Sequence, residues 1–160
     1  MILYHGSNVT VDHPKLVQQN RYLDFGFGFY TTTNQDQAVN FAQKVTERRK
    51  NGAATLNIYS LDEAVAFRAC SLLYFDSPNE AWLDFVAANR QGTYQGKQHD
   101  LIYGAVANDD VYRTITLYLT GVLTKEQALA ALKIRKLFNQ LVFATETSLQ
   151  YLHFEGRELV

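Results

Sequence analysis

A run of aromatic side chains interrupted by two glycines, residues 21–32, constrains the fold of this chain more than any other stretch. Gly26 and Gly28 alternate there with phenylalanines, and Tyr30 follows. Glycine permits a positive φ or a close approach of the backbone to another group, and rings beside a bend offer flat faces to a planar ligand. The run therefore predicts either a site for an aromatic ligand or a turn whose rings only pack the core.

The same glycines begin, but do not complete, the dinucleotide-binding pattern G-x-G-x-x-G. The third glycine would fall at position 31, which is threonine, and no β-α-β unit surrounds the run. We therefore exclude that type of loop and keep other aromatic ligands open.

Hydrophobic patterning predicts short strands dispersed among helices. The predicted strands are residues 2–5, 28–32, 54–60, 101–106 and 141–143, with weaker candidates at 64–68 and 152–159. The predicted helices are 33–50, one that starts with Ser77 as its N-cap and Pro78 in its first turn, 124–136 and 145–151, whereas 113–119 fits either state. This order favours an α+β fold over a doubly wound sheet.

The length and charge of the chain limit the class of protein. A chain of 160 residues with 47% hydrophobic side chains predicts one domain, residues 1–160, with a full core. A formal net charge of -1 gives no general attraction to nucleic acid or to an anionic membrane. Cys70 cannot form an internal disulfide, and no zinc-ligand spacing surrounds it. With no signal peptide and no apolar run long enough to span a bilayer, we expect a cytoplasmic protein without a metal or a membrane partner.

Three segments occur in an order that resembles a known enzyme family. They are His5-Gly6-Ser7 at the end of the first strand, Gly28-Phe29-Tyr30, and Asn139-Gln140-Leu141-Val142-Phe143 in a late strand. Together they are similar to the ADP-ribosyltransferases of the diphtheria-toxin and poly-ADP-ribose-polymerase branch, which carry His, Tyr and Glu on three separate segments. Over nearly its whole length the chain also resembles a bacterial family of small uncharacterised proteins, of DUF3990 type, that is grouped with those transferases.

The resemblance implies a fold and a set of site residues. The fold is a split antiparallel β-sheet with flanking helices around a cleft that holds NAD. His5 would bind the adenosine-side ribose with Ser7 beside it, and the backbone of Gly6 would hold the nicotinamide carboxamide. Tyr30 and Phe41 would stack on the nicotinamide ring. Arg21 would reach the pyrophosphate as a bidentate donor.

Each of these residues also has a plain structural explanation. His5 can be a satisfied strand-end histidine, Tyr30 and Phe41 can be core, and Ser7 can cap a turn. Asp109 and Asp110, after a strand, fit either the acceptor side of the site or a polar loop.

The chain departs from the family pattern at the catalytic glutamate, where it has Gln140. A carboxamide can hydrogen-bond a ribose hydroxyl, but it carries no charge and is not a general base. Glu146 follows six residues later and could replace the missing carboxylate or be a surface charge. Ala38 stands where the polymerases have a serine that binds the carboxamide.

We therefore expect a mono-ADP-ribosyltransferase that uses NAD and an unidentified protein or nucleic-acid acceptor, with His5, Tyr30 and Gln140 in catalytic positions. A toxin paired with a cognate antitoxin is one context for so small a transferase. The rival hypotheses are a non-catalytic NAD or ADP-ribose-binding module, favoured by Gln140, and a purely structural domain.

Overall fold

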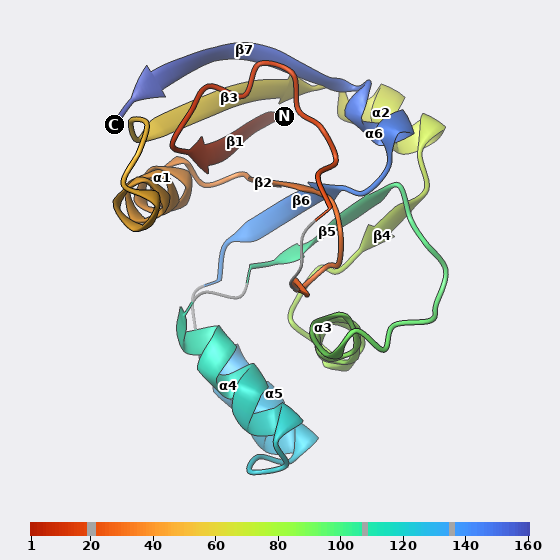
Figure 1. The fold of residues 1–160 in the computed structure, drawn as a ribbon. Coiled ribbons are helices and arrows are strands. Elements are labelled where there is room, and N and C mark those ends of the chain that lie inside the picture. The colour runs from red at the N-terminus through yellow and green to blue at the C-terminus, as the bar shows by residue number, and fades with distance from the viewer. Residues whose placement is uncertain (19–21, 107–108, 135–136) are drawn as a thin grey trace.

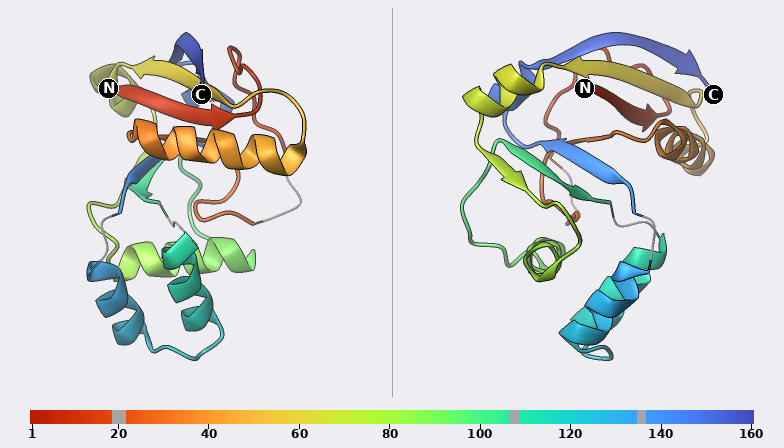
Figure 2. Two further views of the ribbon diagram at one scale, coloured as in Figure 1. Left: turned by 90° about the vertical axis from the view of Figure 1, so that its left-hand side faces the viewer. Right: turned by 180° about the vertical axis from the view of Figure 1, so that it is seen from behind.

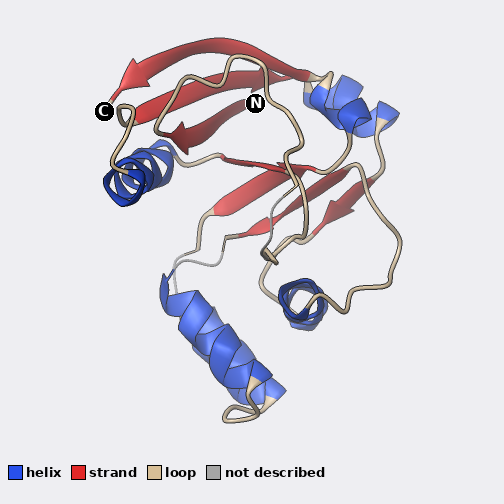
Figure 3. Ribbon diagram, viewed as in Figure 1, coloured by secondary structure: helices blue, strands red, loops and turns tan. Residues whose placement is uncertain are grey.

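The computed structural model describes residues 1–18, 22–106, 109–134 and 137–160. Its strands are β1 (Ile2–Ser7), β2 (Phe29–Thr32), β3 (Thr55–Leu61), β4 (Leu72–Tyr74), β5 (Leu101–Ala105), β6 (Asn139–Phe143) and β7 (Leu152–Leu159). Its helices are α1 (Gln35–Arg49), α2 (Glu63–Ala69), α3 (Glu80–Gln91), α4 (Asp109–Leu119), α5 (Lys125–Lys133) and α6 (Glu146–Leu149). The chain is α+β, as the pattern of elements predicted (Figure 3).

The seven strands form one sheet in the order β4-β5-β6-β2-β1-β3-β7. β1 pairs with β3 along its whole length, whereas β1 and β2 share a single register position, Tyr4 opposite Thr32. The sheet therefore has two parts that are joined narrowly at β1 and β2: β1, β3 and β7 lie above β2, β6, β5 and β4 in Figure 1. β4 and β5 run parallel, so the sheet is mixed rather than wholly antiparallel.

Two hydrophobic clusters pack against this sheet. One joins the β5–β6 part to α3, α4 and α5, with Trp82, Ile115 and Leu132 fully buried. The other fills the space between the two parts of the sheet, with Leu3 and Tyr59 on one side and Leu141 and Phe143 on the other. The α4–α5 hairpin, inserted between β5 and β6, projects from the rest of the molecule (Figure 2).

The helix α1 is placed by its caps and by small side chains. Asn34 caps its first turn by accepting a hydrogen bond from the Gln37 N–H, and Lys50 ends it in the left-handed conformation. Ala38 and Ala42 are buried against β1, so the helix axis approaches the strand closely.

Four points of local structure were predicted wrongly, incompletely or not at all. Residues 64–68 belong to α2 rather than to a strand, because Asp62 caps that helix through the Val65 N–H and Ala66 is buried. The N-cap of α3 is Asn79, so Ser77 and Pro78 precede the helix. Residues 113–119 are helical within α4, and β4, with three residues, was not predicted at all.

Candidate functional site

Tyr30 is fixed by a turn that immediately precedes it. The Tyr30 hydroxyl donates a hydrogen bond to the Gly26 carbonyl oxygen at 2.6 Å and accepts one from the Phe25 N–H at 3.0 Å. Gly26 has φ 76°, which favours glycine. Burial raises the pKa of Tyr30, so its side chain is a neutral phenol at all physiological pH values. We call residues 24–26 the tyrosine-holding turn.

His5 reaches across the narrow joint between the two parts of the sheet. Its Nδ1 lies 2.8 Å from the Tyr30 carbonyl oxygen, and its ring lies 4.5 Å from that of Phe29, centroid to centroid. Burial lowers the pKa of His5 more than the bond to this carbonyl raises it. The neutral ring therefore donates from Nδ1, because a carbonyl oxygen only accepts, and Nε2 keeps a lone pair that can accept a hydrogen bond from a ligand hydroxyl.

The strands β1 and β2 separate beside this contact. Continuing the register from Tyr4 opposite Thr32 would put Gly6 opposite Tyr30, but pairing stops after the first position. The His5 side chain provides the next link between the strands in place of a backbone ladder. Two of the predicted catalytic residues therefore meet through one backbone carbonyl, at the point where the sheet opens.

Gly6 lies closely against α1. A Cβ atom at this position would lie 2.0 Å from the Ala38 carbonyl oxygen and 2.8 Å from the Ala42 nitrogen. The closeness of α1 is therefore enough to explain the absence of a side chain at this position. Ser7 likewise has a local role, since its Oγ accepts a hydrogen bond from the Val9 N–H at 3.4 Å.

Gln140 is the most unusual polar residue of the site. Its side chain is only 5% exposed, and its buried Nε2 has no hydrogen-bond partner within the described part of the chain. Gln140 lies opposite Thr32 on β2 and opposite Gly104 on β5. Since side chains alternate along a strand, Gln140 and Val142 share one face, and Tyr30, opposite Val142, shares it with them.

Phe41 and Ala38 lie on α1, which packs mainly against β1. Ala38 is buried, whereas Phe41 leaves 48% of its surface exposed and is therefore not a core residue. The helix does not need the half-exposed Phe41 ring for its packing on β1, so this ring can stack on a ligand.

The structure does not bring every candidate residue to this site. Arg21 lies outside the described residues. Glu146 is an exposed residue in the first turn of α6, on a separate turn from Gln140, as the sequence suggested. Asp109 and Asp110 begin α4. Among the residues the structure describes, no group of three or more His, Cys, Asp and Glu side chains is arranged to hold a metal ion.

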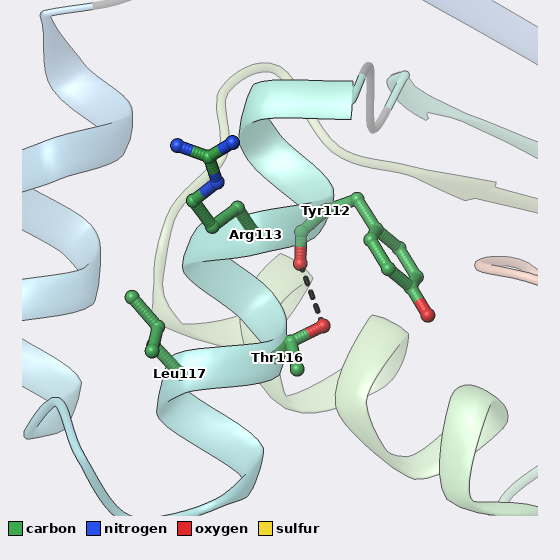
Figure 4. A pocket seen from close by; sticks show the side chains of 4 residues that line it. All are labelled: Tyr112, Arg113, Thr116 and Leu117. Carbon is green, nitrogen blue, oxygen red and sulfur yellow. Dashed lines mark hydrogen bonds between the residues drawn. The ribbon is translucent and has the colours of Figure 1, made fainter.

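A shallow surface pocket lies away from these residues, on α4. Figure 4 shows its lining side chains, with Tyr112 directed toward α3 and Arg113 toward the opposite side. The hydroxyl of Thr116 there donates to the Tyr112 carbonyl at 2.9 Å, within the helix.

Comparison with known proteins identifies the family. The family described as "Protein of unknown function (DUF3990)" matches residues 1–154. The chain belongs to the DUF3990 family. No curated protein and no solved structure matches it. No helix in the described part of this DUF3990 protein is long and apolar enough to cross a membrane.

Two residues that support the site in this DUF3990 chain were not predicted. Asn57 is fully buried, and its amide donates to the carbonyls of His5 at 3.2 Å and Val9 at 3.3 Å while accepting from the Val11 N–H. Arg90 forms an ion pair with Asp24 of the tyrosine-holding turn. A polar residue inside an apolar strand was the available signal for Asn57, whereas no local pattern indicates a pair that is 66 residues apart.

Proposed function

We propose that this DUF3990 protein binds NAD and transfers its ADP-ribose group to a macromolecular acceptor, as a mono-ADP-ribosyltransferase. The proposal includes the fold: we assign the two-part sheet to the split sheet of ADP-ribosyltransferases, with NAD at the opening between β1 and β2. Supporting this are the resemblance of three ordered segments and the contact between His5 and Tyr30 at that opening.

The observation that carries the proposal is the buried, unpartnered amide of Gln140. Burying a polar group without a partner costs about 1–3 kcal/mol, and such groups are rare in native proteins. In the proposed complex a ribose hydroxyl would satisfy this amide, so the cost in the free protein would be recovered on binding. A purely structural residue at this position would have no reason to be polar.

The reaction needs few groups from the protein. The bond between ribose C1′ and the nicotinamide nitrogen breaks, and neutral nicotinamide leaves with the electron pair. The acceptor atom then bonds to C1′, and its proton is released to solvent. In this scheme Tyr30 and Phe41 hold the leaving group, while His5 Nε2 and Gln140 orient ribose hydroxyls on a sugar that becomes oxocarbenium-like.

Gln140 also favours a second candidate function, a module that binds NAD or ADP-ribose without turnover. A neutral amide does not stabilise positive charge on the sugar as a carboxylate would. The two functions share one binding site and differ in whether nicotinamide is released.

The test has three parts. NAD should raise the melting temperature of the wild-type protein, because a ligand that binds only the folded state stabilises it, and Tyr30→Ala should remove this gain. Nicotinamide release with a lysate should fall in Gln140→Ala, and Gln140→Glu should raise NAD hydrolysis. Labelled NAD with lysate, followed by protease or nuclease, identifies the acceptor class.

An equal NAD-dependent rise in melting temperature in wild type and Tyr30→Ala would contradict the proposed site. A rise in melting temperature without nicotinamide release would favour the binding module.

A further inference from the structure

The tyrosine-holding turn is itself held by one end of α3. Asp24 in this turn accepts a hydrogen bond from Nε of Arg90, in the last turn of α3, and Nη2 of the same guanidinium forms an ion pair with the Asp24 carboxylate. The pair is largely buried, with 9% of the Asp24 side chain and 19% of the Arg90 side chain exposed. A Cβ atom at Gly26 would lie 2.8 Å from Oδ1 of Asn89, so the neighbouring residue of α3 also touches the turn.

Arg90 also contacts an aromatic ring of α4. Its guanidinium carbon lies 4.3 Å from the centre of the Tyr112 ring of α4, a cation–π geometry. The Asp24 and Arg90 side chains are largely buried, and a buried ion pair interacts more strongly than an exposed one. Arg90 therefore connects three segments: α4, α3 and the turn.

The connection continues to the candidate site through two hydrogen bonds. The turn offers the Tyr30 hydroxyl its donor, the Phe25 N–H, and its acceptor, the Gly26 carbonyl. The charges of Asp24 and Arg90 both affect the pKa of Tyr30, consistent with their closeness to its hydroxyl. Each residue on the path from Arg90 through the turn to Tyr30 is at least partly buried and takes part in the ion pair or the hydrogen bonds described above.

We infer that Arg90 is a positioning residue for Tyr30: it fixes the turn that orients the ring proposed to stack on nicotinamide. This rests on the proposed function only for the identity of the ligand. The alternative is that the Asp24–Arg90 pair attaches a loop to a helix and has no effect on the site.

A matched pair of variants separates these two roles. Arg90→Met removes the ion pair while keeping an unbranched side chain of similar reach. Lys125→Met is the control, because Lys125 also joins two helices by ion pairs, with Glu80 and Asp84, but does not contact the turn. NAD affinity is measured by calorimetry well below the melting temperature, in each variant and in a Tyr30→Phe background.

We expect Arg90→Met to weaken NAD binding by roughly tenfold, the effect of losing about one charge-assisted hydrogen bond, and Lys125→Met to leave it unchanged. The effect of Arg90→Met should shrink in Tyr30→Phe, since residues that act through one contact are not additive. Unchanged affinity in Arg90→Met, or equal weakening in both variants, would overturn the inference.

Hydrogen exchange of the Phe25 amide decides the question independently of the ligand. In Arg90→Met the protection of this amide should fall while the amides of the central strands stay protected. In Lys125→Met the protection of the Phe25 amide should persist. If the wild-type protein does not bind NAD, the proposed function fails, and this measurement alone decides on Arg90: protection retained in Arg90→Met would refute its positioning role.

Discussion

Gln140 is a residue whose polarity is unfavourable for stability. Leucine has a similar size and no amide to satisfy, so Gln140→Leu should raise the free energy of unfolding by about 1 kcal/mol while abolishing the thermal shift with NAD. Chemical denaturation measures the first effect and a thermal shift assay the second.

Asn57 provides the opposite case for comparison. Its buried amide is fully hydrogen-bonded, so Asn57→Leu leaves the His5 and Val9 carbonyls unpaired and should destabilise the protein by about 1–3 kcal/mol or more. If both leucine variants lose stability, the Gln140 amide has a partner in the free protein.

His5 should make stability depend on pH. Burial lowers its pKa in the folded state, so the unfolded chain takes up a proton first as pH falls below the ordinary value of 6.5. The free energy of unfolding is therefore unaffected well above pH 6.5 and falls as pH drops from there toward the lowered pKa. The decline in melting temperature between about pH 7.5 and 5.5 should be shallower in His5→Gln, in which a neutral amide replaces the imidazole. The slope that remains belongs partly to His99, whose pKa burial also lowers; an unchanged slope would show that His5 titrates normally.

The site residues could be predicted from sequence because they lie in short recognisable segments, but their contacts could not. The bond from His5 to the Tyr30 carbonyl exists only because β1 and β2 separate, and the sequence of neither strand indicates where pairing stops. The close contact between Gly6 and the backbone of α1 likewise depends on tertiary packing, which no local sequence pattern indicates.

At the scale of elements, the closeness of β1 and α1 depends on one position. Gly6→Ala would force α1 to move, because backbone atoms rather than flexible side chains occupy the space. The loss should reach or exceed the upper end of the roughly 1–3 kcal/mol typical of overpacking, as measured by chemical denaturation.

Gly156 in β7 is the matched control for this substitution. A Cβ there meets nothing within 4 Å, so Gly156→Ala should be neutral or stabilising by about 0.5–1 kcal/mol. Similar losses in the two variants would mean that α1 accommodates the methyl group.

Capping residues marked the starts of α1 and α5, whereas hydrophobic patterning misassigned the short helix α2. Thr124 and Gln127 form a capping box at the start of the predicted helix 124–136, and Asn34 caps α1 near the start of the predicted helix 33–50. The misassigned α2 has only seven residues, too few for a helical period to differ clearly from a strand's. β4 has three residues and is a strand only because it pairs with β5.

At the scale of the whole molecule, the strand order was beyond sequence analysis, since four of the six neighbouring pairs in the sheet join strands that are not consecutive along the chain or that run parallel across a helix. The narrow joint gives a prediction of its own. A ligand bound at the opening contacts both parts of the sheet, so NAD should slow amide hydrogen exchange in β1 and β2 together. Protection of only one part, measured by mass spectrometry, would place the ligand away from the opening.

The α4–α5 hairpin has a consequence for how such a protein can diversify. Ala105 and Asn139, at the ends of β5 and β6, lie opposite each other, and the Val106 N–H bonds the Phe138 carbonyl at 2.6 Å. The chain thus leaves the sheet and returns to it at one place, where a longer insertion adds little closure entropy and no change of strand register. A change of length or surface in this segment would have to keep its buried apolar positions, such as Val111 and Ala128, and the Tyr112 ring against Arg90.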